Sequence, residues 1–171
     1  MKTGTFAILL LLAMPVPATT YLAPEKFVQQ SFDKTPVLEI LWLTPALQTG
    51  AREILGHPYR ALRIRYWRAG DRSAWILNEI GKEKPITIGV VVDGDRIVNV
   101  AVLEFRESRG DEVHHPFFTR QFEDLTLSDD LVLSGKVDGI TGATLSVNAV
   151  TNVTRLALYL DEAAEKHQKD R

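Results

Sequence analysis

The chain has 171 residues, which favours a single domain, and its 45% hydrophobic and 25% charged residues are typical of a globular protein. The formal net charge of -2 disfavours a nucleic-acid partner, which selects a basic surface. Because the sequence contains no cysteine, it excludes disulfides, zinc–cysteine sites, iron–sulfur clusters, the usual covalent haem attachment and a lipidated cysteine anchor.

The first 18 residues have the pattern of a secretory signal peptide. Lys2 precedes a short apolar run over residues 6–13, prolines interrupt it, and Val16-Pro17-Ala18 offers small residues for cleavage. The run is shorter than the roughly 20 residues that a membrane-spanning helix needs. We therefore expect residues 1–18 to be removed and the mature protein to be periplasmic or otherwise extracytoplasmic. A short uncleaved anchor is the alternative.

Residues 19–73 are expected to form the N-terminal part of the domain. The pattern predicts a short helix over residues 24–32 and an apolar strand over 37–43. Thr44 and Pro45 then suit the cap and first position of a helix that ends near Gly56.

A β-rich block follows and continues into the core region, which is expected over residues 74–171. Leu62, Ile64 and Tyr66 alternate with Arg63, Arg65 and Trp67, and further strands are predicted at 74–80, 86–92 and 97–105. Asp93-Gly94 is a strong signal for a tight hairpin between the last two. The block predicts an antiparallel meander of about four strands.

Residues 107–115 are expected to form a loop and residues 116–122 a short helix, while 125–132 is ambiguous. The clearest helix comes last, because apolar residues recur from Ala149 to Ala164 at spacings of three and four. We expect it to begin near Leu145 or Ser146. The predicted class is therefore α+β: an antiparallel sheet of about four or more strands, an N-terminal helical segment, and a C-terminal helix packed on the sheet.

The segment directly before that helix carries the chemistry. It reads Asp-Gly-Ile-Thr-Gly-Ala-Thr-Leu-Ser over residues 138–146. Gly139 and Gly142 permit a close approach to the backbone, and Thr141 and Thr144 present hydroxyl groups. A hydroxyl at a helix N-terminus suits a phosphate group. The same residue types are also typical of an ordinary helix cap after a turn, in which Thr144 is only structural.

Asp138-Gly139-Ile140-Thr141-Gly142-Ala143-Thr144 resembles the flavinylation motif of the FMN-binding domain family. That family includes the peripheral flavin subunits of the Rnf complex and of the sodium-pumping NADH:quinone reductase. The resemblance covers residues 74 to 160 in order and spacing, and it includes the hairpin over 85–103, Glu107-Ser108-Arg109-Gly110 and the Phe-x-x-Gln-Phe segment at 118–122. The chain departs from those subunits in lacking their longer Glu-Thr-Pro-Gly-type loop and in having a signal in place of their membrane helix. Both departures favour a free-standing small flavoprotein.

In the family, the last Thr of the motif carries FMN as a phosphoester, which a separate flavin transferase installs from FAD, with magnesium, outside the cytoplasm. The resemblance implies that Thr144 is the covalent attachment residue. It also implies that the cofactor is bound by neighbours in the motif and by residues of the matching region. These are Asp138, Gly139, Thr141, Gly142, Ala143, Leu145, Ser146, Glu107, Arg109 and Trp75. Glu107 and Arg109 either touch the isoalloxazine or pair on the surface, and Trp75 either stacks on the flavin or belongs to the core.

These features favour an exported electron carrier with covalent FMN, which is a substrate of the transferase and has no catalytic residues of its own. Its expected partners are the flavin transferase and redox proteins that are membrane-associated or periplasmic. The alternatives are a flavin-dependent reductase that acts on a small substrate, and a binding or sensory module that keeps the fold without the cofactor.

Two further clusters have simpler interpretations. His114-His115 suggests a metal ligand pair, but adjacent histidines without an evident third ligand favour a solvated loop, so no metal site is expected. Arg63, Arg65 and Arg68 are expected to form the solvated face of a strand.

Overall fold

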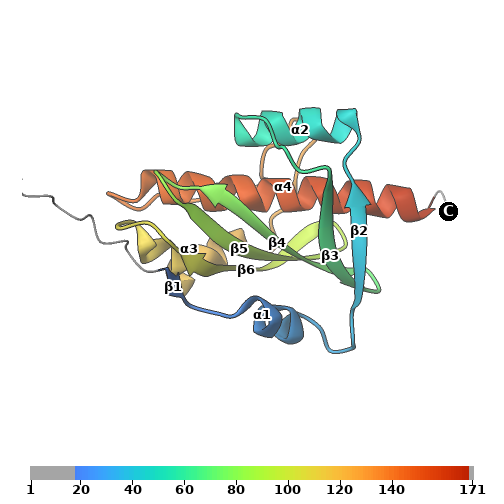
Figure 1. Ribbon diagram of the computed structural model, residues 1–171, viewed down its shortest axis with the longest axis horizontal. Coiled ribbons are helices and arrows are strands. Elements are labelled where there is room, and N and C mark those ends of the chain that lie inside the picture. The colour runs from blue at the N-terminus through green and yellow to red at the C-terminus, as the bar shows by residue number, and fades with distance from the viewer. Residues whose placement is uncertain (1–17, 170–171) are drawn as a thin grey trace, which may run out of the picture.

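The structure is a computed structural model in which residues 18–169 are described (Figure 1). The predicted signal peptide, apart from Ala18, lies outside the described residues. Among the described residues, no helix is both long and apolar enough to cross a membrane.

A single antiparallel sheet of six strands forms the centre of the molecule, in the order β1-β6-β5-β4-β3-β2. The strands are β1 (Thr19–Thr20), β2 (Val37–Trp42), β3 (Arg63–Ala69), β4 (Arg72–Ile80), β5 (Pro85–Asp93) and β6 (Arg96–Phe105). The predicted meander corresponds to β3–β6. The apolar segment at 37–43 joins it as β2, and β1, which was not predicted, pairs with the end of β6. The α+β class is confirmed.

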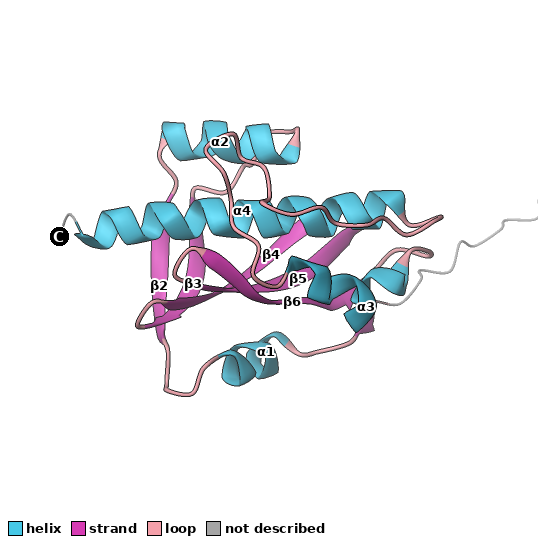
Figure 2. Ribbon diagram, turned by 180° about the vertical axis from the view of Figure 1, so that it is seen from behind, coloured by secondary structure: helices cyan, strands magenta, loops and turns pink. Residues whose placement is uncertain are grey.

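Helices cover the two faces of the sheet unequally. The long helix α4 (Thr144–Lys169) lies across one face and contacts β4, β5 and β6, and α2 (Pro45–Leu55) packs against α4 (Figure 1). The short helix α1 (Pro24–Ser31) lies on the opposite face (Figure 2). The C-terminal helix is therefore packed on the sheet as predicted, and the N-terminal helical segment consists of α1.

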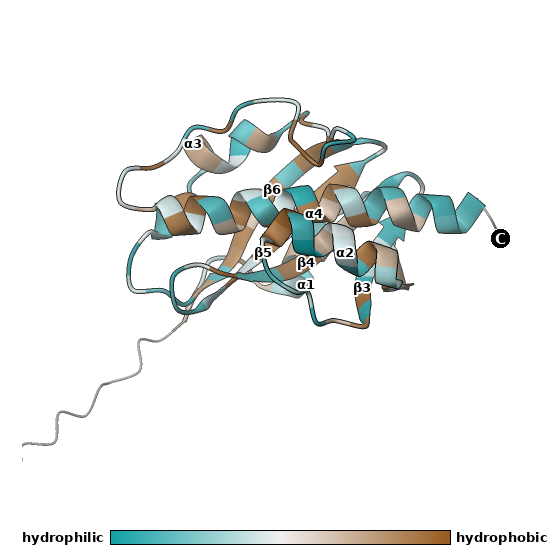
Figure 3. Cartoon of the chain, turned by 90° about the horizontal axis from the view of Figure 1, so that it is seen from above, coloured by the Kyte–Doolittle hydropathy of each residue, from teal (hydrophilic) through white to brown (hydrophobic). Residues whose placement is uncertain are grey.

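The core follows from the alternation of the strands. β5 is buried along most of its length, and the apolar stripe of α4 lies over it, while the C-terminal end of α4 is hydrophilic (Figure 3). The main core takes residues from β2 and α2 as well as from β4–β6 and α4, so the parts before and after residue 74 share one hydrophobic core. On the other face, a Cβ atom at Gly89 would lie 2.5 Å from the ring of Phe27, so this glycine allows α1 to pack directly on β5.

The segment between β6 and the motif is less regular than the sequence suggests. The expected loop includes a 3-10 turn, η1 (Asp111–His114). The expected helix over 116–122 is divided into α3 (Pro116–Thr119) and a second 3-10 turn, η2 (Arg120–Phe122). The ambiguous segment forms no strand and contributes only an isolated bridge between Leu127 and Leu133.

Candidate functional site

The motif forms an open loop that leads directly into α4. Its apolar members Val137 and Ile140 pack against the main core, and Ala143 is buried. The residues between them face solvent: Asp138, Gly139, Thr141, Gly142, Thr144 and Leu145 are exposed. The core therefore holds the loop at three points and presents its polar and small residues outward.

The turn before the helix is formed by backbone contacts. The N–H of Ala143 donates to the carbonyl of Ile140 at 3.0 Å, and Gly142 has a φ of 85°, a value that favours glycine. A Cβ atom at Gly139 or Gly142 would meet nothing within 4 Å. Among the described residues, the space beside these two glycines is therefore open, so a phosphate or another protein has room to approach.

Thr144 is the first residue of α4, one residue earlier than the sequence suggested. Its side chain is exposed, and no partner of its hydroxyl is found within residues 18–169. The N–H of Val147 donates to Ala143, which leaves the amides of Thr144, Leu145 and Ser146 at the free N-terminus of the helix. An exposed hydroxyl and unpaired N–H groups therefore lie within one turn.

The loop over 107–110 is held against this turn. Gly110 has a φ of 86°, and a Cβ atom there would lie 2.7 Å from the Oγ of Ser146 and 3.4 Å from the Cβ of Ala143. Ser146 is itself buried. The structure thus brings together two of the predicted site segments, and it assigns Ser146 to the contact between them.

Glu107 has a structural role within this loop. Its carboxylate accepts hydrogen bonds from the backbone N–H groups of Lys82, Glu83 and Lys84, at 2.5 to 2.8 Å, and so fixes the turn between β4 and β5. Desolvation on its own raises the pKa of Glu107, but the three N–H donors outweigh it and lower the pKa from 4.5. Arg109, in contrast, is exposed and forms no ion pair with the described residues.

The beginning of the motif is tied to the Phe-x-x-Gln-Phe segment. The N–H of Asp138 donates to the side-chain oxygen of Gln121 at 2.7 Å. The carboxylate of Asp138 is 78% exposed and lies 3.4 Å from the ammonium of Lys136. Gln121 was noted only as part of the resemblance, and its role in holding the loop joins residues 17 positions apart.

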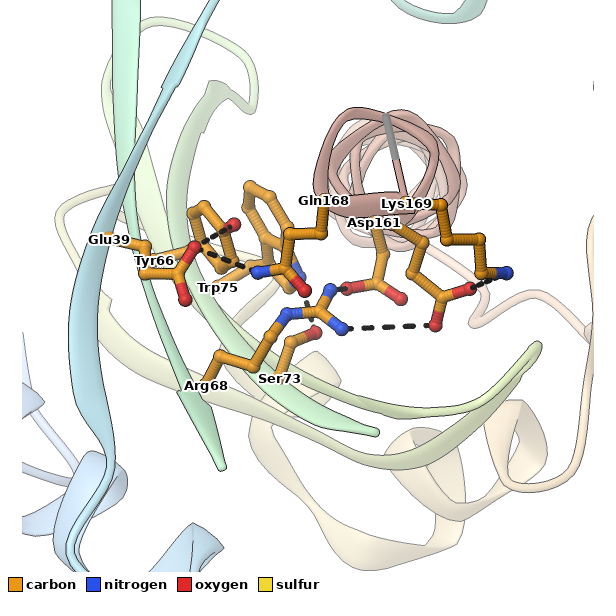
Figure 4. Close-up of polar contacts among 9 residues, drawn as sticks. Glu39, Tyr66, Arg68, Ser73, Trp75, Asp161, Gln168 and Lys169 are labelled. Carbon is orange, nitrogen blue, oxygen red and sulfur yellow. Dashed lines mark hydrogen bonds and ion pairs between the residues drawn. The ribbon is translucent and has the colours of Figure 1, made fainter. Parts of the chain in front are cut away.

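Trp75 belongs to the core and has no exposed surface to offer a flavin. Its ring stacks on Tyr66 with centroids 4.4 Å apart, and its indole N–H donates to the Oγ of Ser73 at 2.7 Å (Figure 4). Of the two interpretations of Trp75, the structure therefore supports the core residue, because the strand alternation that buries Tyr66 also buries its neighbour on β4.

The paired histidines lie beside β1. His114 stacks on Tyr21 with ring centroids 3.9 Å apart, and the Tyr21 hydroxyl donates to Asp111 at 3.0 Å. Within residues 18–169, no group of three or more histidine, aspartate or glutamate side chains is placed to hold a metal ion. The contact with Tyr21 spans 90 residues or more and has no local signal in the sequence.

A wide groove lies elsewhere on the molecule. It has a volume of about 830 Å³ and is lined by α1, the segment before β3, and the strands β3 and β4, including Arg63, Arg65 and Trp67. None of the residues from the motif or from the 107–110 loop contributes to it. Arg68 points to the other face of the sheet and is buried, so the predicted basic stripe contains only Arg63 and Arg65.

The fold and this site together define an α+β domain with an exposed loop and helix start suited to a phosphate-bearing cofactor. Residues 81–159 match the family model of the FMN-binding domain. The match assigns this segment to the FMN-binding domain and supports FMN as its cofactor. No curated protein shows significant similarity to the chain.

Proposed function

We propose that this protein is exported, carries FMN through a phosphoester to Thr144, and acts as an electron carrier. The observation that carries the proposal is the exposed hydroxyl of Thr144, the first residue of α4. Thr144 is also the last residue of the segment whose sequence resembles the flavinylation motif. A phosphoester requires a hydroxyl group, and a transferase requires that the hydroxyl be accessible. The surroundings of Thr144 meet both requirements.

The local electrostatics also suit the product. The phosphodiester retains one negative charge, and the amides of Leu145 and Ser146 lie at the positive end of α4. A negative charge at such a position is stabilised by about 0.3–1 kcal/mol. Arg109 is the exposed cation on the neighbouring loop and is the residue we assign to contact with the bound cofactor.

In the proposed attachment, the transferase acts on FAD with magnesium. The bond between the two phosphates of FAD breaks, a new bond forms between the FMN phosphorus and the Oγ of Thr144, and AMP leaves. The hydroxyl proton is released to solvent. Gly139 and Gly142 have no side chains to obstruct the transferase, and the open space beside them supports this role.

A carrier is favoured over a reductase because the groove of about 830 Å³ is lined by α1, β3 and β4 and includes none of the motif. A reductase for a small substrate needs a substrate cavity beside the flavin. The redox partners of a carrier instead approach the flavin at the surface. We place these partners in the periplasm or at the membrane, where an exported protein would meet them.

The test is the intact mass of the exported protein from cells that contain a flavin transferase. We expect the wild type to gain the mass of FMN less one water, Thr144→Ala to gain nothing, and Thr144→Ser to retain the addition because serine supplies the same hydroxyl. Thr141→Ala is the matched control, since Thr141 is an exposed threonine in the same loop.

An unmodified wild type would overturn the proposed attachment and leave Thr144 as a helix residue. Modification that persists in Thr144→Ala but is lost in Thr141→Ala would move the attachment to Thr141. Steady-state turnover of a small substrate by the single purified protein would favour the reductase over the carrier.

A further inference from the structure

The edge strand β2 exposes apolar side chains on both faces of the sheet. Val37 is 64% exposed, Leu38 50%, Ile40 43% and Trp42 61%, although all four lie in one six-residue strand. β2 is the last strand of the described sheet and pairs only with β3, while the C-terminal end of α4 crosses one face of β2 and extends past it (Figures 1 and 2). An exposed apolar edge of this length is a template for pairing with another strand.

The backbone N–H and C=O groups on the outer side of β2 also have no partner strand in the described sheet. The N–H of Leu43 donates to Leu62, so in this antiparallel pair Leu41 and Glu39 also face β3. The alternate residues Leu38, Ile40 and Trp42 therefore direct their N–H and C=O groups away from the sheet. The three residues with free backbone groups are thus also three of the exposed apolar residues.

The near absence of charged residues in β2 indicates which kind of strand could pair with this edge. Natural edge strands are usually protected by lysine, proline or an inward-pointing charge, and Glu39 is the only charged residue in β2. Glu39 accepts hydrogen bonds from Tyr66 at 2.7 Å and from Gln168 of α4 at 2.9 Å (Figure 4). The residues with outward-facing backbone groups, Leu38, Ile40 and Trp42, are all uncharged, so the edge suits an uncharged apolar strand such as β2 itself.

We propose that β2 pairs antiparallel with β2 of a second copy of this chain, around a twofold axis at Ile40. In this register Ile40 faces its own copy and Leu38 faces the partner's Trp42, so all outward backbone groups of these residues are paired. Glu39 faces the partner's Leu41, which keeps the two carboxylates from opposing each other. The two sheets join into one continuous sheet, and the interface closes on itself, as twofold contacts do.

The arginines beside β2 are compatible with this pairing. The Cζ of Arg63 lies 5.7 Å from the centre of the Trp42 ring, and Arg65 is on the same face of β3. In the dimer, two β2 strands separate these arginines from their copies, a span of about 14 Å at the usual strand spacing. This span exceeds the screening length of about 8 Å at physiological ionic strength, so their repulsion is weak.

The test is the mass of the purified protein in solution, measured by light scattering and sedimentation from micromolar to near-millimolar concentration. We expect the wild type to reach twice the chain mass and Ile40→Lys to remain at the chain mass. Val98→Lys is the matched control, because Val98 is a similarly exposed β-branched strand residue, on β6. We expect this control to behave as the wild type does.

Hydrogen exchange provides the second measurement. We expect the amides of Leu38, Ile40 and Trp42 to be protected in the wild type at high concentration and to exchange rapidly in Ile40→Lys. A wild type that remains monomeric, or an Ile40→Lys variant that still doubles in mass, would overturn the proposal. The same experiment can be run on Thr144→Ala, so its result does not depend on the flavin.

Discussion

At the scale of single residues, the contact between Arg68 and Asp161 fastens the distal half of α4 to the sheet. The two side chains are 6% and 2% exposed, and the guanidinium lies 2.8 Å from the carboxylate, with Glu165 at 3.8 Å (Figure 4). Burial raises the pKa of Asp161 from 3.8 to about 6, against the opposing effects of Ser73 and Arg68. Folding therefore disfavours the ionised form of Asp161 relative to its neutral form.

The pH dependence of stability follows from this shift. Because the folded pKa of Asp161 is raised, the free energy of unfolding rises as pH falls from above 6 towards 3.8. The pKa of His57 is raised from 6.5 by its hydrogen bond with Glu79, so its contribution is present below 6.5 and is lost as pH rises through the folded value. Both groups act in the same direction, and we expect a higher free energy of unfolding at pH 5.5 than at pH 7.5.

Denaturant titrations at the two pH values check this expectation. Asp161→Asn removes the titrating carboxyl, so we expect the variant to gain less stability than the wild type between pH 7.5 and pH 5.5, with only the contribution of His57 remaining. A wild type that is weaker at pH 5.5, or an equal gain in the variant, would contradict the assignment.

The alternation of residues in β3 indicates that Arg68 is buried, although the prediction placed it on the solvated face with Arg63 and Arg65. The alternation that buries Ile64 and Tyr66 also turns Arg68 inward, so it never shared a face with Arg63 and Arg65. Its partner Asp161 lies 93 residues away, and no local pattern indicates that contact. Residue-scale prediction was therefore limited to orientation and did not extend to long-range partners.

At the scale of elements, the local rules of capping and alternation predicted most of the fold. Thr44 caps α2 by accepting from Leu47, and Gly56 ends that helix with a φ of 77°. The Asp93-Gly94 hairpin joins β5 to β6 as expected. The irregular segment 107–137 was harder to predict because its conformation depends on contacts with distant elements, such as the hydrogen bonds from Lys82–Lys84 to Glu107.

The packing of the 107–110 loop on α4 gives a prediction at this scale. Gly110→Ala places a side chain at a positive φ, which costs about 1–2 kcal/mol, and adds a collision with the Oγ of Ser146. Gly56→Ala is the matched control, because Gly56 also has a positive φ but meets nothing within 4 Å. We expect Gly110→Ala to lower the free energy of unfolding more than the control does.

The excess should depend on Ser146. In the Ser146→Ala background, the Oγ atom is absent, and we expect part of the additional destabilisation of Gly110→Ala to disappear in a double-mutant cycle. Equal losses for Gly110→Ala and Gly56→Ala in denaturant unfolding would show that the loop does not press on the helix.

At the scale of the whole molecule, the order of the site segments along the chain could be predicted, but the contacts between them could not. The motif, the helix after it and the class of the fold were all indicated by the sequence, and the FMN-binding domain match covers the same region. The contact between Gly110 and Ser146, and the anchoring of Asp138 by Gln121, depend on how the chain folds back on itself. Of the two interpretations of Trp75, only that of a core residue agrees with its complete burial.

The proposed export has a consequence for the folded protein. Cleavage after Ala18 would leave Thr19 as the first residue, and Thr19 is the first residue of β1. We therefore expect the exported protein to begin at Thr19 in N-terminal sequencing and the extracytoplasmic fraction to contain it. A chain that retains residues 1–18 would support the uncleaved anchor instead.

If two copies pair as proposed, the length of α4 sets the distance between their proposed attachment residues. Gln168, near its C-terminal end, reaches Glu39 on the edge strand, while Thr144 lies 24 residues earlier, about 36 Å away along the helix axis. In the proposed dimer the two Thr144 residues therefore point in opposite directions from the joined edges. Two flavins bound at these residues would be too far apart to exchange electrons directly. Each copy in the dimer would therefore have to be reduced and oxidised through its own encounter with a redox partner.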